Sequence, residues 1–584
     1  MTEKKEILFV TPFTPRGGKV AQYSQELIQT MRETFEDSFS INVCALESGK
    51  ISYNYSDLVK CKMQTGEHKQ YVLTAEDINK NDRINLVCIQ HDFNLFGGEY
   101  GENILYFLYT LTKPIIITFH TVLERPKVIC KQLVKGIATV SEKIIVMNKY
   151  DAEILKREYE IPSEKIAVIP FTDRLDIFSD SKSNLTFYQN NHFNEMQNSA
   201  IAYANMFKKT LKDKLPLKYN LNEISLAHIK RITNNAGILR HSNWSQPDIN
   251  SGYSIDDNAH ALIALTLHFE LTKEKSDLTL IKIYLKFIES NQRSNGSFIT
   301  NLDKFGNSVP DDSGEDYQVS TARTIWALGE FISRGNSFSS DLIKTAERVM
   351  EKTFSYIEDF DSPKAIAFSI KGLYHYNLTR KSPEIKQIIV SLANHLISKY
   401  HKLDNVDFEW FEDSLSFENC VLPESLLYAY LETGNEIYKT VAKISFDYLL
   451  SITIDENKIQ IISNKYFYKN ENNQLIFHEY PIDVSYTILA LDLFYEVFSE
   501  EEYWEKLEIA FSWFNGNNYL FKVMYNHNTG GCYDELGEES VNPDESAEST
   551  VTYLIARLII EKYIGIPEEK EAEELEFEPA ISEY

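Results

Sequence analysis

The sequence predicts a multidomain chain, in which a doubly wound parallel α/β sheet is followed by an all-helical toroid. Three observations support this prediction. The chain has 584 residues, more than one ordinary hydrophobic core accommodates. Residues 1–172 alternate short apolar runs with amphipathic helical segments, as α/β folds do. From residue 220 onward the periodicity is helical throughout.

The first region is predicted to contain parallel strands, because continuous apolar runs are typical of strands that are buried on both faces. Such runs occupy residues 5–13, 85–93, 114–120, 143–148 and 165–171. Helical patterns lie between them, which predicts an open Rossmann-like sheet over residues 1–172. Residues 173–219 are rich in Ser and Asn and are predicted to be a linker with a helix near its end.

The second region repeats a helix-sized apolar segment six times, and most of these segments open with an acidic or small polar cluster. They occupy residues 254–269, 315–332, 362–376, 417–432, 481–498 and 545–563. More amphipathic helical segments alternate with them. Because a helix that is apolar nearly all round is buried, residues 220–566 are predicted to form six hairpins closed into an (α/α)6 toroid. An open solenoid is the alternative.

Composition excludes several classes of partner. The formal net charge of −27 argues against nucleic acid and anionic membrane surfaces. Six scattered Cys residues without metal-like spacing indicate free thiols in a reducing compartment, and no metal or cofactor is expected. Neither a signal peptide nor a membrane span is expected, so we predict a cytoplasmic protein. Residues 567–584 are predicted to be an acidic, disordered tail.

The α/β region offers a candidate cleft at the carboxyl ends of its strands, where open α/β sheets bind ligands. Gly17 and Gly18 follow the first predicted strand, and backbone N–H groups at such a turn can face an anion. Gly97 and Gly98 form a second glycine-rich loop, and His120 ends a strand. A plain turn and a structural histidine are the alternatives.

These motifs together with TFHTVLERP, IVMNKYDAEIL and EKIAVIPF resemble the N-terminal lobe of family-four retaining glycosyltransferases, which have the GT-B fold. In that family the Gly loop and the His face the sugar-transfer cleft, which implies this role for Gly17, Gly18 and His120. GT-B enzymes also need a second lobe for the sugar nucleotide, and residues 173–219 are too short to supply it. Docking, scaffolding and vestigial roles therefore stay open beside transfer.

In the helical region, carboxylates recur where apolar helices begin. Single acids there are ordinary N-caps. As a set at one rim of a toroid they would raise one another's pKa and supply the acid and base that glycoside cleavage needs. We predict Asp316 with Glu412 or Asp413 as the catalytic pair. The predicted substrate-binding residues are His241, Trp244, Tyr253, Asp256, Asp257, Asn258, Tyr317, Arg323, Trp410, Asp483, Asp534 and Glu548.

The phrases GILRHSNWSQPDINSGYSIDDNAHALIA, WFEDSLSFENCVLPESLL and ESAESTVTYLIARL resemble the region that follows a full family-four transferase in many bacterial proteins. That region is similar to six-hairpin glycosidases. The resemblance implies a protein that acts on oligosaccharides, with mannose-containing ones as candidates. The alternatives are hexosyl transfer from a sugar nucleotide and non-catalytic glycan binding or scaffolding. A separate glycosyltransferase or glycan-processing enzyme is a candidate partner.

Overall fold

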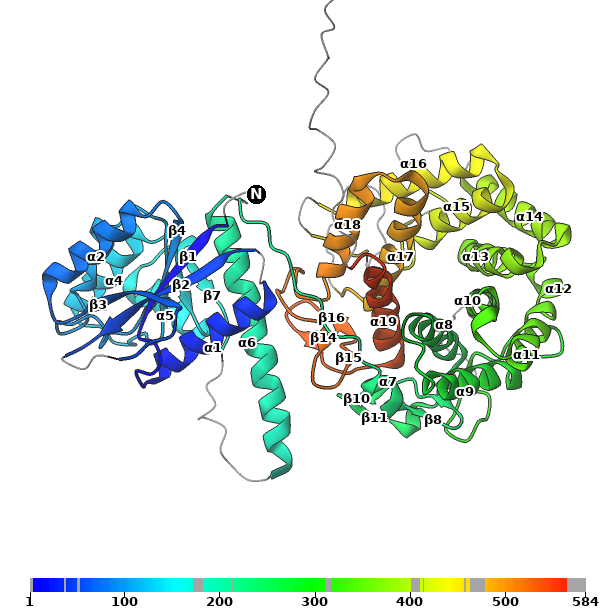
Figure 1. Cartoon of the computed structure of the whole chain (residues 1–584), viewed down its shortest axis with the longest axis horizontal. Coiled ribbons are helices and arrows are strands. Elements are labelled where there is room, and N and C mark those ends of the chain that lie inside the picture. Colours follow the sequence, from blue (N-terminus) through cyan, green and yellow to red (C-terminus); the bar gives the residue numbers. More distant parts are fainter. Residues whose placement is uncertain are drawn as a thin grey trace, which may run out of the picture. The chain divides into compact units, whose positions relative to one another are not determined.

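The computed structural model describes residues 4–35, 38–49, 53–171, 182–212, 214–309, 317–400, 410–412, 414–455, 458–462 and 478–564, without the side chains of 182–193. The chain divides into two compact units (Figure 1). The first comprises Met1–Glu223 and Asn515–Val523, and the second comprises Ile224–Phe514 and Met524–Tyr584. The predicted tail, residues 567–584, lies outside the described residues.

The first unit is built on a parallel sheet, as predicted. The strand order is β3-β2-β1-β4-β5-β6-β7, and all the strands are parallel. Strands are added on one side of β1 up to β3, and from β4 onward on its other side. The strands are β1 Glu6–Thr11, β2 Ser40–Glu47, β3 Val59–Gln64, β4 Ile84–His91, β5 Ile115–Phe119, β6 Lys143–Val146 and β7 Ile166–Val168. Sequence reasoning missed β2 and β3. The strand β3 lies at the edge of the sheet, and its exposed Lys60 and Lys62 alternate with more buried residues. It therefore lacks the continuous apolar run from which strands are predicted.

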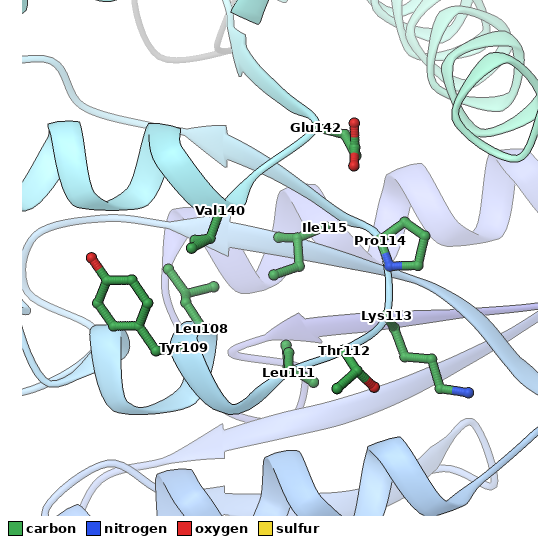
Figure 2. A pocket seen from close by; sticks show the side chains of 9 residues that line it. All are labelled: Leu108, Tyr109, Leu111, Thr112, Lys113, Pro114, Ile115, Val140 and Glu142. Atoms are coloured by element: carbon green, nitrogen blue, oxygen red, sulfur yellow. The ribbon is translucent and has the colours of Figure 1, made fainter.

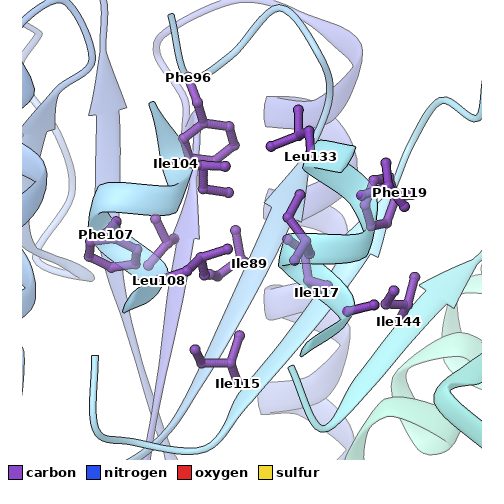
Figure 3. Close-up of a cluster of buried hydrophobic side chains, with 14 of the residues drawn as sticks. Ile89, Phe96, Ile104, Phe107, Leu108, Ile115, Ile117, Phe119, Leu133 and Ile144 are labelled. Carbon is purple, nitrogen blue, oxygen red and sulfur yellow. The ribbon is translucent and has the colours of Figure 1, made fainter. Parts of the chain in front are cut away.

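Helices cover both faces of this sheet. They are α1 Lys19–Thr34, α2 His68–Lys80, α3 Ile104–Thr110, α4 Val128–Val140, α5 Lys149–Tyr159 and α6 Lys182–Thr210. On one face Phe107 of α3 and Leu133 of α4 pack against Ile89 and Ile117 of the strands (Figure 3). On the other face α6 packs along α1, and its Phe207 ring lies 6.2 Å from that of Phe9. Burying each such side chain contributes about 1.5–3 kcal/mol.

The second unit is a closed ring of helical hairpins, which confirms the (α/α)6 toroid and excludes the open solenoid. In its described part six inner helices each contact the next, and α19 returns to α8 (Figure 1). The inner helices are α8 Ile255–Thr272, α10 Tyr317–Ser333, α13 Pro363–Arg380, α15 Val421–Thr433, α17 Pro481–Phe498 and α19 Ala547–Glu561. They are buried over most of their circumference, as the sequence predicts for the inner set.

The outer helices alternate with the inner ones along the chain. They are α7 Ala227–Ile232, α9 Asp277–Ser290, α11 Ser340–Glu351, α14 Pro383–Tyr400, α16 Glu436–Thr453 and α18 Glu501–Ser512, and a short α12, Phe354–Ile357, follows α11. Each outer helix buries one face and exposes the opposite face. The buried face of α9, for example, carries Ile281, Leu285 and Ile288. None of the helices in the described residues is long and apolar enough to span a bilayer.

Two inner helices approach so closely that only glycine fits between them. A Cβ atom on Gly329 of α10 would lie 2.0 Å from the carbonyl oxygen of Gly372 in α13. Glycine is otherwise unfavourable inside a helix by about 1 kcal/mol. The close approach of the two backbones is therefore the physical reason for a glycine at each position.

We expect Gly329→Ala to reduce the free energy of unfolding by about 3 kcal/mol, the upper end of the usual cost of overpacking, because backbone atoms must move to admit the methyl group. Urea denaturation followed by circular dichroism measures the change. Gly335→Ala is the matched control, since its Cβ would meet only the side chain of Ile343, at 3.5 Å. Equal stabilities for the two variants would contradict this account of the helix contact.

Candidate active site

The candidate site lies at the amino-terminal ends of the inner helices, which the ring brings to one rim. β12 (Tyr253–Ser254), just before α8, pairs with β13 (Asn301–Leu302) in the segment that leads to α10. The backbone N–H of Glu418, just before α15, donates to Asp483 Oδ1 in the first turn of α17 at 2.6 Å. These bonds join the entrance of α8 to that of α10, and the entrance of α15 to that of α17.

Arg323, in the second turn of α10, is the centre of the mouth at this rim. Its guanidinium pairs with Asp256 Oδ1 of α8 at 3.2 Å and with Glu418 Oε1. Ser320 donates to the second oxygen of Asp256 at 2.7 Å. The arginine and aspartate side chains are each 12% exposed, so breaking the pairs would leave poorly solvated charges. Arg323 therefore holds two carboxylates from other helices in fixed positions.

Two further carboxyl groups of the mouth hold protons near neutral pH. Burial raises the pKa of Asp483 to about 7, and the nearby Glu418 carboxylate adds to the rise. Burial also raises the pKa of Glu548, in the first turn of α19, to about 7, although Arg323 partly opposes the shift. Asp483 Oδ2 and Glu418 Oε2 are buried without a hydrogen-bond partner among the described residues. The mouth thus combines protonated acids with arginine-paired carboxylates.

The floor beneath these acids is aromatic and uncharged at neutral pH. His260 Nε2 lies 2.6 Å from the hydroxyl of Tyr486, and its ring contacts that of Trp326. Burial lowers the pKa of His260 to about 3, with a smaller contribution from Arg323, so the ring is neutral. Deeper in the ring, Lys371 and Glu424 form a buried pair at 2.6 Å.

One edge of the mouth carries Glu412 and Lys364. Burial raises the pKa of Glu412, which Lys364 and Lys399 oppose, and Glu412 Oε2 is buried without a partner in the described part of the chain. Lys364 Nζ donates to Ser416 Oγ at 2.7 Å and lies 3.9 Å from the centre of the Phe417 ring. Glu412 and Glu418 interact electrostatically, which links this edge to the centre.

The predicted site residues are only partly brought together. Asp256, Arg323, Asp483 and Glu548 meet at the mouth, whereas Asp316 and Asp413 lie outside the described residues. Asp534 accepts from the Ser546 N–H at 2.7 Å, and burial raises its pKa to about 6. Glu412 stands at the edge just described.

The remaining predicted residues lie around this mouth or in its supporting structure. Trp244, Tyr317 and His241 are exposed, whereas Trp410 is fully buried against Phe411. Tyr253 is buried and bonded to Asn234. The Asp257 N–H donates to the Ser254 hydroxyl, which caps α8. The Asn258 side chain donates to the Ser254 carbonyl and accepts from the Ile238 N–H.

Sequence reasoning missed several residues of the mouth: Glu418, His260, Tyr486, Ser320 and Lys364. Helical spacing carried a usable signal for two of them, because His260 follows Asp256 by four residues and Tyr486 follows Asp483 by three. Glu418 had no such signal. It precedes its helix with a left-handed backbone, φ 55°, and only its contacts with other helices reveal it.

The first unit presents its predicted cleft residues at the carboxyl ends of the strands. His120 Nε2 lies 2.8 Å from Gln90 Oε1, and burial lowers the pKa of His120 to about 4. No atom of the described residues lies within 4 Å of the Cβ position of Gly17 or Gly18, so the backbone there is open. The predicted cleft therefore contains a neutral histidine and accessible main chain.

The second glycine-rich loop is already filled by a side chain of its own. The N–H groups of Glu99 and Tyr100 donate to the Glu102 carboxylate at 3.1 and 2.9 Å, and a Cβ on Gly98 would overlap that carboxylate. These N–H groups lower the pKa of Glu102. Gly97 and Gly98 thus serve to fold the loop around an internal anion.

A cavity of about 350 Å³ lies at the other end of the strands, where β5 and β6 begin (Figure 2). Thr112, Lys113 and Pro114, which precede β5, line it together with Glu142, which precedes β6. Because the strands are parallel, these residues lie at the amino ends and His120 at the carboxyl ends. The cavity is therefore separate from the predicted cleft.

No protein-family model matches the chain, and no curated protein matches its sequence. Among solved structures, a D-mannose isomerase is similar with 14% identity and a TM-score of 0.45, over 58% of this chain and 96% of that one. A cellobiose 2-epimerase from Bacillus thermoamylovorans has 12% identity and a TM-score of 0.44, over 62% and 99%. A GH76 alpha-mannanase from Bacteroides thetaiotaomicron has 12% identity and a TM-score of 0.39, over 53% and 86%. With TM-scores below 0.5, these similarities carry no weight for the chemistry of this chain.

Replacing Arg323 with Met should lower the free energy of unfolding by about 3–5 kcal/mol, because Asp256 and Glu418 lose their charged partner. The loss should be larger at about pH 8 than at about pH 5. Arg323 lowers the pKa of Glu548, so its removal raises that folded-state pKa above about 7, and the stability lost as pH rises from the unfolded-state pKa to the folded-state pKa becomes larger. Urea denaturation at the two pH values measures this. Arg348→Met, which removes an exposed pair with Glu289, is the control and should change little.

Proposed function

We propose that the helical ring is a carbohydrate-active enzyme that hydrolyses a glycosidic bond of an oligosaccharide. Glu548 is the proton donor and Glu418 is the opposing carboxylate. The observation that carries this proposal is the presence, in one mouth, of an acid with a pKa of about 7 and an arginine-paired carboxylate. Glycoside cleavage needs this combination of a protonated and an ionised carboxyl group.

In the proposed reaction, Glu548 transfers its proton to the glycosidic oxygen as the bond to the anomeric carbon breaks. The leaving sugar departs as an alcohol. Glu418 accepts a proton from a water molecule, whose hydroxyl group bonds to the anomeric carbon, and solvent exchange then restores both carboxyl groups. Direct attack by Glu418 is the retaining variant of the same chemistry. Glu548 is half-buried, so it can reach a substrate at the mouth.

The neighbouring residues support this assignment by holding the pair. Asp483 Oδ1 accepts from the Glu418 N–H and fixes the segment that carries the base. Its second oxygen has no partner among the described residues and suits a sugar hydroxyl. Asp256 anchors Arg323, which in turn orients Glu418. Mannose-containing oligosaccharides are the first substrates to test.

For the first unit we propose sugar-nucleotide or acceptor-sugar binding near Gly17, Gly18 and His120. The open backbone at the two glycines and the neutral His120 support this second proposal. Titration calorimetry with GDP-mannose on the whole chain tests it. Binding that His120→Ala abolishes would support it, and an absence of heat with GDP-mannose, UDP-glucose and mannobiose alike would exclude it.

We expect kcat/KM to fall tenfold for each pH unit above about pH 7, because Glu548 then loses the proton that it must donate. Initial rates on a manno-oligosaccharide across a pH series measure the alkaline limb. The limb should move to higher pH when Arg323 is replaced by Met, because Arg323 lowers the pKa of Glu548, and to lower pH in Asp256→Asn, because the Asp256 carboxylate raises it. Rates that are independent of pH up to pH 9 would contradict an acid of this pKa.

Glu548→Gln should lower kcat on a manno-oligosaccharide by about 10²–10⁴-fold, because the leaving group is no longer protonated. A 4-nitrophenyl mannoside should recover most of that loss, since its leaving group needs no acid. Glu418→Gln should impair both substrates equally. Glu505→Gln, an exposed glutamate of α18, is the control. If both active-site variants retain wild-type turnover, the assignment is wrong.

A further inference from the structure

The exposed aromatic side chains of the second unit gather at the rim of the acidic mouth. Among its described residues, the Trp, Tyr and Phe side chains that are more than a third exposed are Trp244, Phe305, Tyr317 and Phe417. All four lie in the segments that lead into inner helices: one before α8, one before α10, one at the start of α10 and one before α15. The exposed large aliphatic residues of this unit lie mostly on the outer helices and at the opposite end of the ring, although Ile249 and Val309 are exposed in the rim segments too.

Phe305 is presented by a turn that its neighbours hold rigidly. The Asp303 carboxylate accepts from the N–H groups of Phe305 and Asn307 at 2.8 and 2.9 Å, and from the Asn307 side chain at 3.0 Å. These bonds lower the pKa of Asp303, so it remains ionised. The Phe305 ring at the tip is 76% exposed. The Lys304 ammonium lies 5.2 Å from the centre of this ring, and at so exposed a site such a contact contributes only about 0.5–1 kcal/mol to the fold.

Trp244 is held in a similar way. Its backbone has φ 57°, a left-handed conformation that costs a non-glycine residue on the order of 1 kcal/mol. The Asp544 carboxylate accepts its N–H at 2.7 Å, and its carbonyl accepts from the Glu545 N–H at 3.1 Å. These bonds maintain the strained backbone while the indole is 49% exposed. Trp244 begins the two-residue turn between the short strands Ser242–Asn243 and Gln246–Pro247, in which a positive φ is usual, so the hairpin fixes where the indole is presented.

The other two rings flank the carboxylates directly. Phe417 precedes Glu418, and Lys364 Nζ lies 3.9 Å from its ring centre. Tyr317 begins α10, one turn before the Ser320 that bonds Asp256, and the Arg293 guanidinium lies 5.8 Å from its ring centre. On the side of α8, Lys304 next to Phe305 bonds Asn250 at 2.8 Å, which ties the Phe305 turn to the loop that follows Trp244.

We propose that this rim binds an uncharged oligosaccharide longer than a disaccharide, with Phe417 and Tyr317 stacking on the sugars next to the cleaved bond and Phe305 and Trp244 on more distant ones. The sugar class rests on the proposed function. Aromatic faces suit the apolar faces of sugar rings, and the intervening polar residues suit their hydroxyl groups. In the sequence no apolar side chain directly adjoins any of the four rings, unlike the continuous apolar core of a protein interface.

Trp244 provides its own reporter for the test. Of the five tryptophans, Trp326, Trp410 and Trp513 are buried and Trp504 is intermediate, so acrylamide should quench Trp244 most. We would titrate the whole chain with hexamers and dimers of mannose, glucose and N-acetylglucosamine. One hexamer should protect the fluorescence from acrylamide, and its dimer should not. Trp244→Phe should remove the protected signal.

Phe305→Ala should weaken binding of that hexamer about tenfold, the size of one stacking contact, and leave binding of the dimer unchanged. Tyr150→Ala, an exposed ring of the first unit, is the matched control and should have no effect. The proposal is overturned if no hexamer protects Trp244, or if Phe305→Ala binds hexamer and dimer as the wild type does. Failure of the proposed function is distinguishable, because a chain without hydrolytic activity would still show this length dependence.

Discussion

The contact of Arg323 with Asp256 and Glu418 is the interaction on which the rest of the site depends. It joins three segments of the ring, and the Glu418 N–H continues the connection to Asp483 in a fourth. A buried guanidinium is stable only when carboxylates surround it, and several crowded carboxylates are stable only around a cation. The arginine therefore explains how one mouth can contain both ionised carboxylates, Asp256 and Glu418, and carboxyl groups with raised pKa values, Asp483 and Glu548.

Closure of the ring is the constraint that makes this contact possible. The inner helices are apolar nearly all round, so each must be covered on every side. Gly329 and Gly372 allow α10 and α13 to approach backbone to backbone, and α19 completes the ring against α8. Parallel inner helices then bring all their amino ends to one rim, and the polar first turns meet there.

Burial links the fold of the ring to its chemistry. The same packing that stabilises the inner helices removes water from Asp483 and Glu548, which raises their pKa values to about 7. Keeping such acids in a core reduces stability at alkaline pH, because the folded state then has to bury the charged form. Such a loss of folding stability is typical of functional sites, where buried ionisable groups with shifted pKa values are kept because the reaction needs them.

The sequence by itself determined five of the seven strands of the parallel sheet, the alternation of inner and outer helices and the place of Asp256, Arg323, Asp483 and Glu548 near the beginnings of inner helices. Local periodicity reports burial, and each of these features is local. Only the tertiary structure decided that Glu418, 95 residues from Arg323, is its partner, and that Trp410 is buried while Trp244 is exposed. Pairing between distant residues and the pKa shifts depend on closure of the ring and on solvent exclusion, neither of which a sequence pattern encodes.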